Sequence, residues 1–250
     1  MIHMKILTKI TILASLLAIG LGTTFATTTD AIMIGAGGES CTIYDNLSSP
    51  NKSVGGGCAA LLGDLNPIAG TDTVAGTVDG WTISITSGTS ASPSDVPVGL
   101  DISSFTATCT GALGTGCSKD ALDIQFSDIN FSPANPAFVT GYSLTSLTGT
   151  GSTSESAYYS NSNKLFAETT LIGKVGPFTG LAAGSATGGV GSVAPYSLTL
   201  DQAFAADAGG ASVSYSADGA VSSVPEPAAV VLLGTVLLFC ASKLRRRRAS

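Results

Sequence analysis

Short runs of alternating apolar and polar residues recur along the chain, and each run predicts a β-strand with one buried face. The clearest run follows the Asp79-Gly80 turn pair, where Trp81, Ile83 and Ile85 alternate with small polar residues. Four further runs share this period: Leu122–Phe126, Tyr142–Leu144, Tyr196–Leu200 and Val213–Tyr215. Strands with one apolar face build antiparallel sheets that pack face to face. We therefore predict an all-β fold, an antiparallel β-sandwich of jelly-roll type. A β-helix is the alternative, although the sequence has no clean repeat period.

Three stretches do not follow this pattern. Residues 149–162 lack apolar alternation, which predicts a flexible surface loop. Residues 180–191 are rich in Gly and Ala, which fits either a loop or a flat, closely packed stretch. The region from Ile32 to Pro67 is harder to assign, and Leu61 to Leu65 fits either a short helical turn or a strand.

The N-terminus has the layout of a secretory signal peptide. Lys5 and Lys9 precede an uncharged apolar run from Ile10 to Gly22, and Thr24-Phe25-Ala26 supplies a small-x-small cleavage site. We predict a signal peptide over residues 1–26 and an extracytoplasmic domain over residues 27–223. An uncleaved anchor is the alternative, but the apolar run is short for a spanning helix of about 20 residues.

The C-terminus consists of three parts in a fixed order. Val224-Pro225-Glu226-Pro227 is a stiff tetrapeptide, because each proline fixes its own φ and disfavours helix in the residue before it. Residues 228–242 form an apolar stretch that predicts a transmembrane helix. A basic cluster follows, made of Lys243, Arg245, Arg246, Arg247 and Arg248. Basic residues stay on the cytoplasmic side, so the central domain is predicted to lie on the opposite, extracytoplasmic side of the membrane. A buried core helix with a basic tail is the alternative.

These 27 residues resemble the PEP-CTERM sorting signal of Gram-negative bacteria. The match rests on the motif at Pro225, Glu226 and Pro227, the helix over 228–242 and the basic tail over 243–250. The resemblance implies recognition by an exosortase, a membrane-embedded cysteine-type transpeptidase-like enzyme. It implies that the tail anchors the chain in the inner membrane transiently and is then removed. The body would reach the cell surface or the extracellular polysaccharide matrix.

Charge and composition narrow the function of the body. Only 11% of the residues are charged, and the segment from Asp30 to Asp218 holds sixteen acids, four lysines and no arginine. Such a surface repels phosphate backbones, so we expect no nucleic-acid partner. The sole histidine, His3, lies in the predicted signal peptide. No nucleophile elbow or P-loop is present. We therefore predict no catalytic residues, no cofactor and no enzymatic activity.

Cysteines predict disulfides in the body. Cys240 lies in the tail, which leaves an even number, Cys41, Cys58, Cys109 and Cys117. In an oxidising compartment these would form two bonds, and we favour Cys41–Cys58 with Cys109–Cys117 because both close short loops. A tetrathiolate metal site and free thiols are the alternatives. Neither pair has the close spacing of zinc ligands, so we predict no metal site there.

One group of aspartates has two interpretations. Asp120, Asp123 and Asp128 lie in or beside one predicted strand, which fits either a solvated strand face or a calcium site. Asp123 has the opposite parity to the other two, so the three cannot all point the same way from a regular strand. The solvated face is the favoured interpretation.

Two functions of the body remain. The first is a non-enzymatic structural or adhesive protein of the surface or matrix. The second is a glycan-binding module acting on exopolysaccharide, with aromatic rings that stack on sugars. Tyr158 and Tyr159 are its best exposed candidates if residues 149–162 form a loop, whereas the alternation around Trp81 predicts a core position.

Overall fold

The computed structural model describes residues 30–45, 52–54, 56, 58–64, 70–90, 99–109, 120–132, 137–188, 191–207, 212–224 and 235. The predicted signal peptide lies outside these residues. So do the predicted sorting motif, transmembrane helix and basic tail, apart from Thr235. Within the described ranges there is no helix long and apolar enough to cross a membrane.

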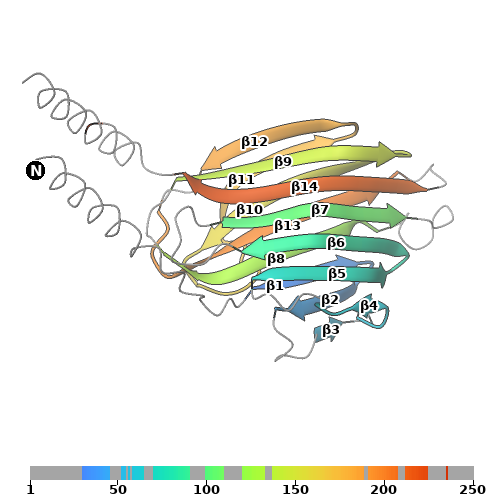
Figure 1. Cartoon of the computed structure of the whole chain (residues 1–250), viewed down its shortest axis with the longest axis horizontal. Coiled ribbons are helices and arrows are strands. Elements are labelled where there is room, and N and C mark those ends of the chain that lie inside the picture. The colour runs from blue at the N-terminus through green and yellow to red at the C-terminus, as the bar shows by residue number, and fades with distance from the viewer. Residues whose placement is uncertain are drawn as a thin grey trace, which may run out of the picture.

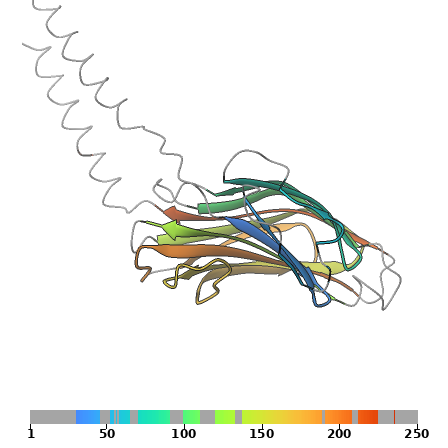
Figure 2. The same ribbon diagram turned by 90° about the horizontal axis from the view of Figure 1, so that it is seen from below.

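The body consists of two antiparallel sheets, which confirms the all-β prediction (Figure 1). Sheet A contains, in spatial order, β11 (Thr170–Phe178), β10 (Gly151–Ser160), β13 (Tyr196–Ala206), β8 (Leu122–Phe131), β1 (Ala31–Ala36), β2 (Glu39–Tyr44) and β3 (Lys52–Val54). Sheet B contains, in spatial order, β12 (Ala182–Gly188), β9 (Ala137–Thr148), β14 (Val213–Val224), β7 (Gly99–Cys109), β6 (Trp81–Ser90), β5 (Thr71–Val78) and β4 (Leu61–Leu62). The two sheets lie face to face, as Figure 2 shows.

The strands from β7 onward pair in a nested order. β7 pairs with β14, β8 with β13, β9 with β12, and β10 with β11. Members of successive pairs alternate between the sheets, so the chain wraps around one core. The strands β1 to β6 extend both sheets on the side of β7 and β8.

The alternating runs bury their apolar side as expected. Trp81, Ile83 and Ile85 of β6 face the interior, and Trp81 is completely buried. Aromatic rings from opposite sheets meet in the core: the ring centroids of Phe105 and Phe204 lie 4.7 Å apart. The turn before β6 has positive φ at both Asp79 and Gly80, the geometry of a type I′ hairpin, for which Asp-Gly is a preferred sequence.

The prediction of a surface loop over residues 149–162 is wrong. Residues Gly151–Ser160 form β10, which lies between β11 and β13 inside sheet A. Its inward positions include Thr153, Glu155 and Ala157, all buried. The backbone alternates between the two faces as in any strand, but the inward side chains are small or polar. The sequence therefore lacks the apolar alternation that would predict a strand. The strand is stabilised by neighbours on both sides that the local sequence does not reveal.

Two ambiguous stretches are now assigned. Ala182–Gly188 is the edge strand β12, so most of the Gly- and Ala-rich segment is a flat strand and not a loop. Leu61–Leu62 is the short strand β4 and not a helical turn.

Candidate functional site

A row of three aspartates crosses three neighbouring strands of sheet A. Ala31 pairs with Tyr44 of β2 and with Ser127 of β8. The next position along each strand is an aspartate, and these are Asp30, Asp45 and Asp128. Each continues the inward parity of its strand, where the neighbouring inward residues are apolar. All three side chains are buried, which places three carboxyl groups side by side beneath the sheet.

Sheet B supplies two more aspartates from the opposite side. Asp72 lies in β5 at the inward position before Val74, and Asp64 follows β4 by two residues. Asp72 is completely buried, and Asp45 and Asp64 expose only 7% and 8% of their surface. One carboxylate oxygen from each of Asp45, Asp64 and Asp72 lies within 4.8 Å of the other two. We call Asp30, Asp45, Asp64 and Asp72 the carboxylate cluster.

Backbone amides orient two members of the carboxylate cluster. The Gly70 N–H donates to Asp45 Oδ2 at 2.7 Å, and the Thr73 N–H donates to Asp64 Oδ1 at 3.1 Å. Asp30 and Asp72 differ, because none of their carboxyl oxygens meets a donor among the described residues. Buried polar groups are almost always hydrogen-bonded, so two buried carboxyl groups without donors require a specific explanation.

The electrostatics of the carboxylate cluster are dominated by burial and like charge. Burial first, then the charges of Asp72, Asp128 and Asp45, raise the pKa of Asp30 to about 9. Burial first, then the charges of Asp64, Asp45 and Asp128, raise the pKa of Asp72 to about 8. Among the described residues, every charged group that acts on Asp30 and Asp72 is a carboxyl group. The fold therefore gathers acidic groups at this point, and no basic side chain of the described ranges offsets them.

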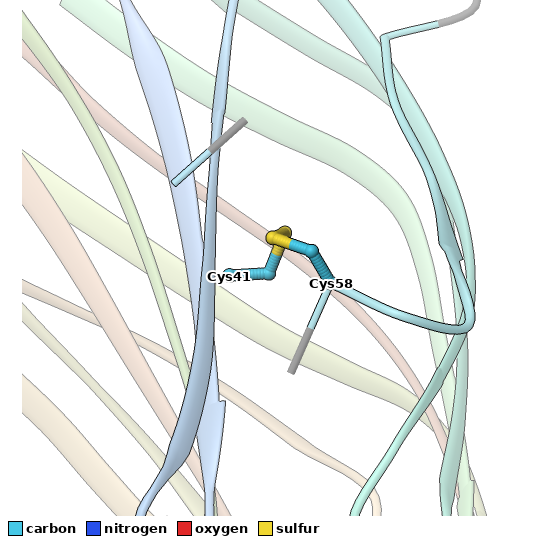
Figure 3. Close-up of a disulfide and its surroundings, with 2 residues drawn as sticks. All are labelled: Cys41 and Cys58. Carbon is cyan, nitrogen blue, oxygen red and sulfur yellow. A yellow bond between two sulfur atoms is a disulfide. The ribbon is translucent and has the colours of Figure 1, made fainter. Parts of the chain in front are cut away.

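A disulfide lies near the segments that carry the carboxylate cluster. Cys41 of β2 is bonded to Cys58, which precedes β4, and Figure 3 shows the bond between these segments. The predicted Cys41–Cys58 pair is confirmed. Cys109 is also disulfide-bonded. Its predicted partner Cys117 lies outside the described residues, so that pairing stays a prediction.

A second polar network lies between the sheets around Glu155 of β10. The Thr140 hydroxyl of β9 donates to Glu155 Oε1 at 2.7 Å, and Gln202 Nε2 of β13 donates to Oε2 at 3.0 Å. Burial raises the pKa of Glu155 to about 8, although these two hydrogen bonds lower it. Gly219 of β14 leaves room for the pair, because a methyl group there would overlap Glu155 Oε2. Thr140, Glu155 and Gln202 are all completely buried, so this network is part of the core.

The aspartates singled out from the sequence do not form one site. Asp123 is exposed on the outer face of β8, and Asp128 is buried on the inner face, as their parity requires. Asp128 belongs beside the carboxylate cluster, and Asp120 lies before the strand. The site residues predicted from the sequence did not include Asp30, Asp45, Asp64 or Asp72. A signal was present, since Asp30 and Asp72 occupy the inward parity of apolar alternating runs.

The aromatic residues offer little for sugar stacking. Tyr159 is buried at 5% exposure and Tyr158 is only half-buried, because both lie in β10 and not in a loop. In the described part of the chain, none of the exposed large hydrophobic side chains is aromatic. An open depression of about 260 Å³ lies over β9, β12 and β14, next to Asp101 and Asp218. The ring of Tyr142 beneath it is itself buried.

Comparison with known proteins does not extend this description. No family model and no curated protein matches the chain. Among solved structures, the active domain of tailspike protein 4 of bacteriophage CBA120 matches with 14% identity and a TM-score of 0.30, over 55% of this chain and 18% of that one. An infectious bursal disease virus structure, Gx strain, matches with 13% identity and a TM-score of 0.32, over 82% of this chain and 53% of that one. This chain therefore spans about a fifth and about half of those two chains.

Proposed function

We propose that this protein is an exported component of the cell surface or extracellular matrix. In this proposal an exosortase sorts and processes it through the PEP-CTERM tail. The observation that carries the proposal is the order of elements at the end of the body. The last strand, β14, ends at Val224, and Pro225-Glu226-Pro227 follows without a linker. The recognition motif would thus stand directly at the edge of a folded domain.

The disulfide supports the exported location. Bonds of this kind persist in oxidising compartments such as the periplasm and the cell surface, and are rare in the cytosol. Cys41–Cys58 joins β2 of sheet A to the turn that precedes β4 of sheet B. A protein that depends on this bond for stability is suited to the side of the membrane that the signal peptide and the positive-inside rule both predict.

We assign the body a structural or adhesive role on a jelly-roll scaffold. The nested pairing of β7 to β14 is the connectivity expected for a jelly roll, a fold used by capsid and lectin domains alike. A fold does not define an activity, so the role rests on the sorting tail and on the absence of catalytic motifs in the sequence. Glycan binding has weaker support, because its candidate tyrosines lie in β10.

Mass spectrometry of the C-terminus tests the sorting proposal. We expect the extracellular form to end near Val224 to Pro227, and the inner-membrane fraction to contain the full chain. Glu226→Ala, or deletion of residues 245–248, should leave the protein in the membrane. Asp207→Ala is the matched control, since it removes an exposed acid of the body and should not change delivery. Normal delivery of both tail variants, or a surface form that ends at Ser250, would refute the proposal.

A further inference from the structure

We propose that the carboxylate cluster is a binding site for one Ca²⁺ ion, with Asp45, Asp64 and Asp72 as ligands and Asp30 beside them. Three carboxylate oxygens from three separate segments converge within 4.8 Å of one another. Asp72, which is completely buried, supplies one of these three oxygens, and neither of its carboxyl oxygens meets a donor among the described residues. A buried carboxylate is stable when it is paired or coordinates a metal, and a cation meets that requirement here.

A second buried carboxyl group, that of Asp30, also lacks a donor among the described residues. Its carboxyl lies within hydrogen-bonding reach of that of Asp45. Two carboxylates can share such a contact only with a proton or a cation between them, since both are acceptors when ionised. A divalent ion held by Asp45, Asp64 and Asp72 would also offset the charge of the neighbouring Asp30, whereas protons would have to be placed on several acids at once.

The donor set favours calcium. All the side chains are carboxylates, which excludes the nitrogen and sulfur ligands that zinc prefers in structural sites. Magnesium usually keeps several waters and binds one or two protein carboxylates, while calcium accepts six to eight oxygens in a flexible arrangement. Four buried carboxyl groups from both sheets fit calcium better. Backbone carbonyls or water would complete the coordination.

The site would act as a clamp between the sheets. Asp30 precedes β1 and Asp45 follows β2 in sheet A, whereas Asp64 follows β4 and Asp72 lies in β5 of sheet B (Figure 1). The Cys41–Cys58 bond joins the same two regions. The ion and the disulfide would therefore hold β1 and β2 of sheet A against the β4–β5 region of sheet B.

Calcium titration of the full-length chain tests this inference. The protein is stripped with a chelator, exchanged into 0.15 M NaCl, and titrated with CaCl₂ by calorimetry. We expect one saturable site per chain with a Kd of about 1 mM or tighter, the range of extracellular calcium modules. Calcium at a hundred times Kd should raise the melting temperature by roughly 5–10 °C. Equal concentrations of MgCl₂ should neither compete nor stabilise.

Two substitutions separate the site from the general negative charge of the body. Asp72→Asn keeps the shape but removes one ligand charge, and should weaken calcium binding at least tenfold. Its melting temperature in chelator should not fall, because the change also removes a buried carboxyl group that lacks a donor among the described residues. Asp64→Asn is the second ligand variant, used if Asp72→Asn does not fold. Glu155→Gln is the control: it replaces a buried acid outside the carboxylate cluster by its amide, and should change the affinity by less than about twofold.

The outcomes are separable. Loss of affinity in a ligand variant but not in Glu155→Gln supports the site. The inference fails if the wild-type chain shows no saturable calcium binding. It also fails if both ligand variants bind as wild type does, or if magnesium stabilises equally well.

Discussion

The buried carboxyl group of Glu155 makes the stability of this protein depend on pH. Its pKa is about 8 in the folded chain against an ordinary value of 4.5. Below pH 4.5 both the folded and the unfolded chain carry the proton, and the folded chain is not penalised. Between pH 4.5 and 8 only the unfolded chain ionises, so stability falls as the pH rises. Above pH 8 both are ionised and the loss is complete.

The size of the effect follows from the two pKa values. Each pH unit between them lowers the free energy of unfolding by about 1.4 kcal/mol, so the loss from pH 5 to pH 8 is about 4 kcal/mol. Glu155→Gln removes this dependence, because an amide does not titrate. The substitution should be tolerated, since Gln202 Oε1 has no hydrogen-bond partner in the described part of the chain and offers an acceptor for the new amide.

The assay is urea denaturation of the full-length wild type and Glu155→Gln at pH 5, 6, 7 and 8, with chelator present. Asp101 and Asp201, whose charges act on Glu155, are shared by both proteins, so their own titration largely cancels in the difference. We expect the variant to gain stability relative to wild type by about 4 kcal/mol across this range. Parallel curves, with a difference that stays constant within 1 kcal/mol, would refute the reasoning.

Two further predictions concern the scaffold. Replacing Cys41 and Cys58 together by serine should lower the free energy of unfolding by about 2–4 kcal/mol, measured by urea denaturation, and an unchanged midpoint would count against a stabilising role. Gly149→Ala should destabilise more than Gly38→Ala, by at least about 1 kcal/mol in the same assay. Both glycines have positive φ, but the new methyl would overlap the backbone carbonyl oxygen of Ser212 at Gly149, whereas nothing lies within 4 Å of it at Gly38. Equal effects would show that the close contact is relieved without cost.

Local chemistry was sufficient for much of the fold. The alternation at Trp81, Ile83 and Ile85 predicts a strand and its buried face, because side chains in a strand point to opposite sides in turn. The Asp79-Gly80 pair predicts its turn, since both positions need positive φ. Cys41 and Cys58 are close enough in sequence for their pairing to be favoured by a short loop. Each of these properties is set by neighbours along the chain.

Tertiary structure alone decided where β10 lies and which acids meet. A strand with Thr153 and Glu155 at inward positions is held by partners on both sides, and those partners come from β11 and β13, later in the chain. The parity of Asp30, Asp45 and Asp72 shows from sequence that each can face inward. Their convergence depends on which strands pair and which sheet covers them. Strand parity is set by neighbouring residues, whereas the pairing of strands and the packing of the two sheets depend on the whole chain. The candidate calcium site therefore forms only when the sheets have assembled.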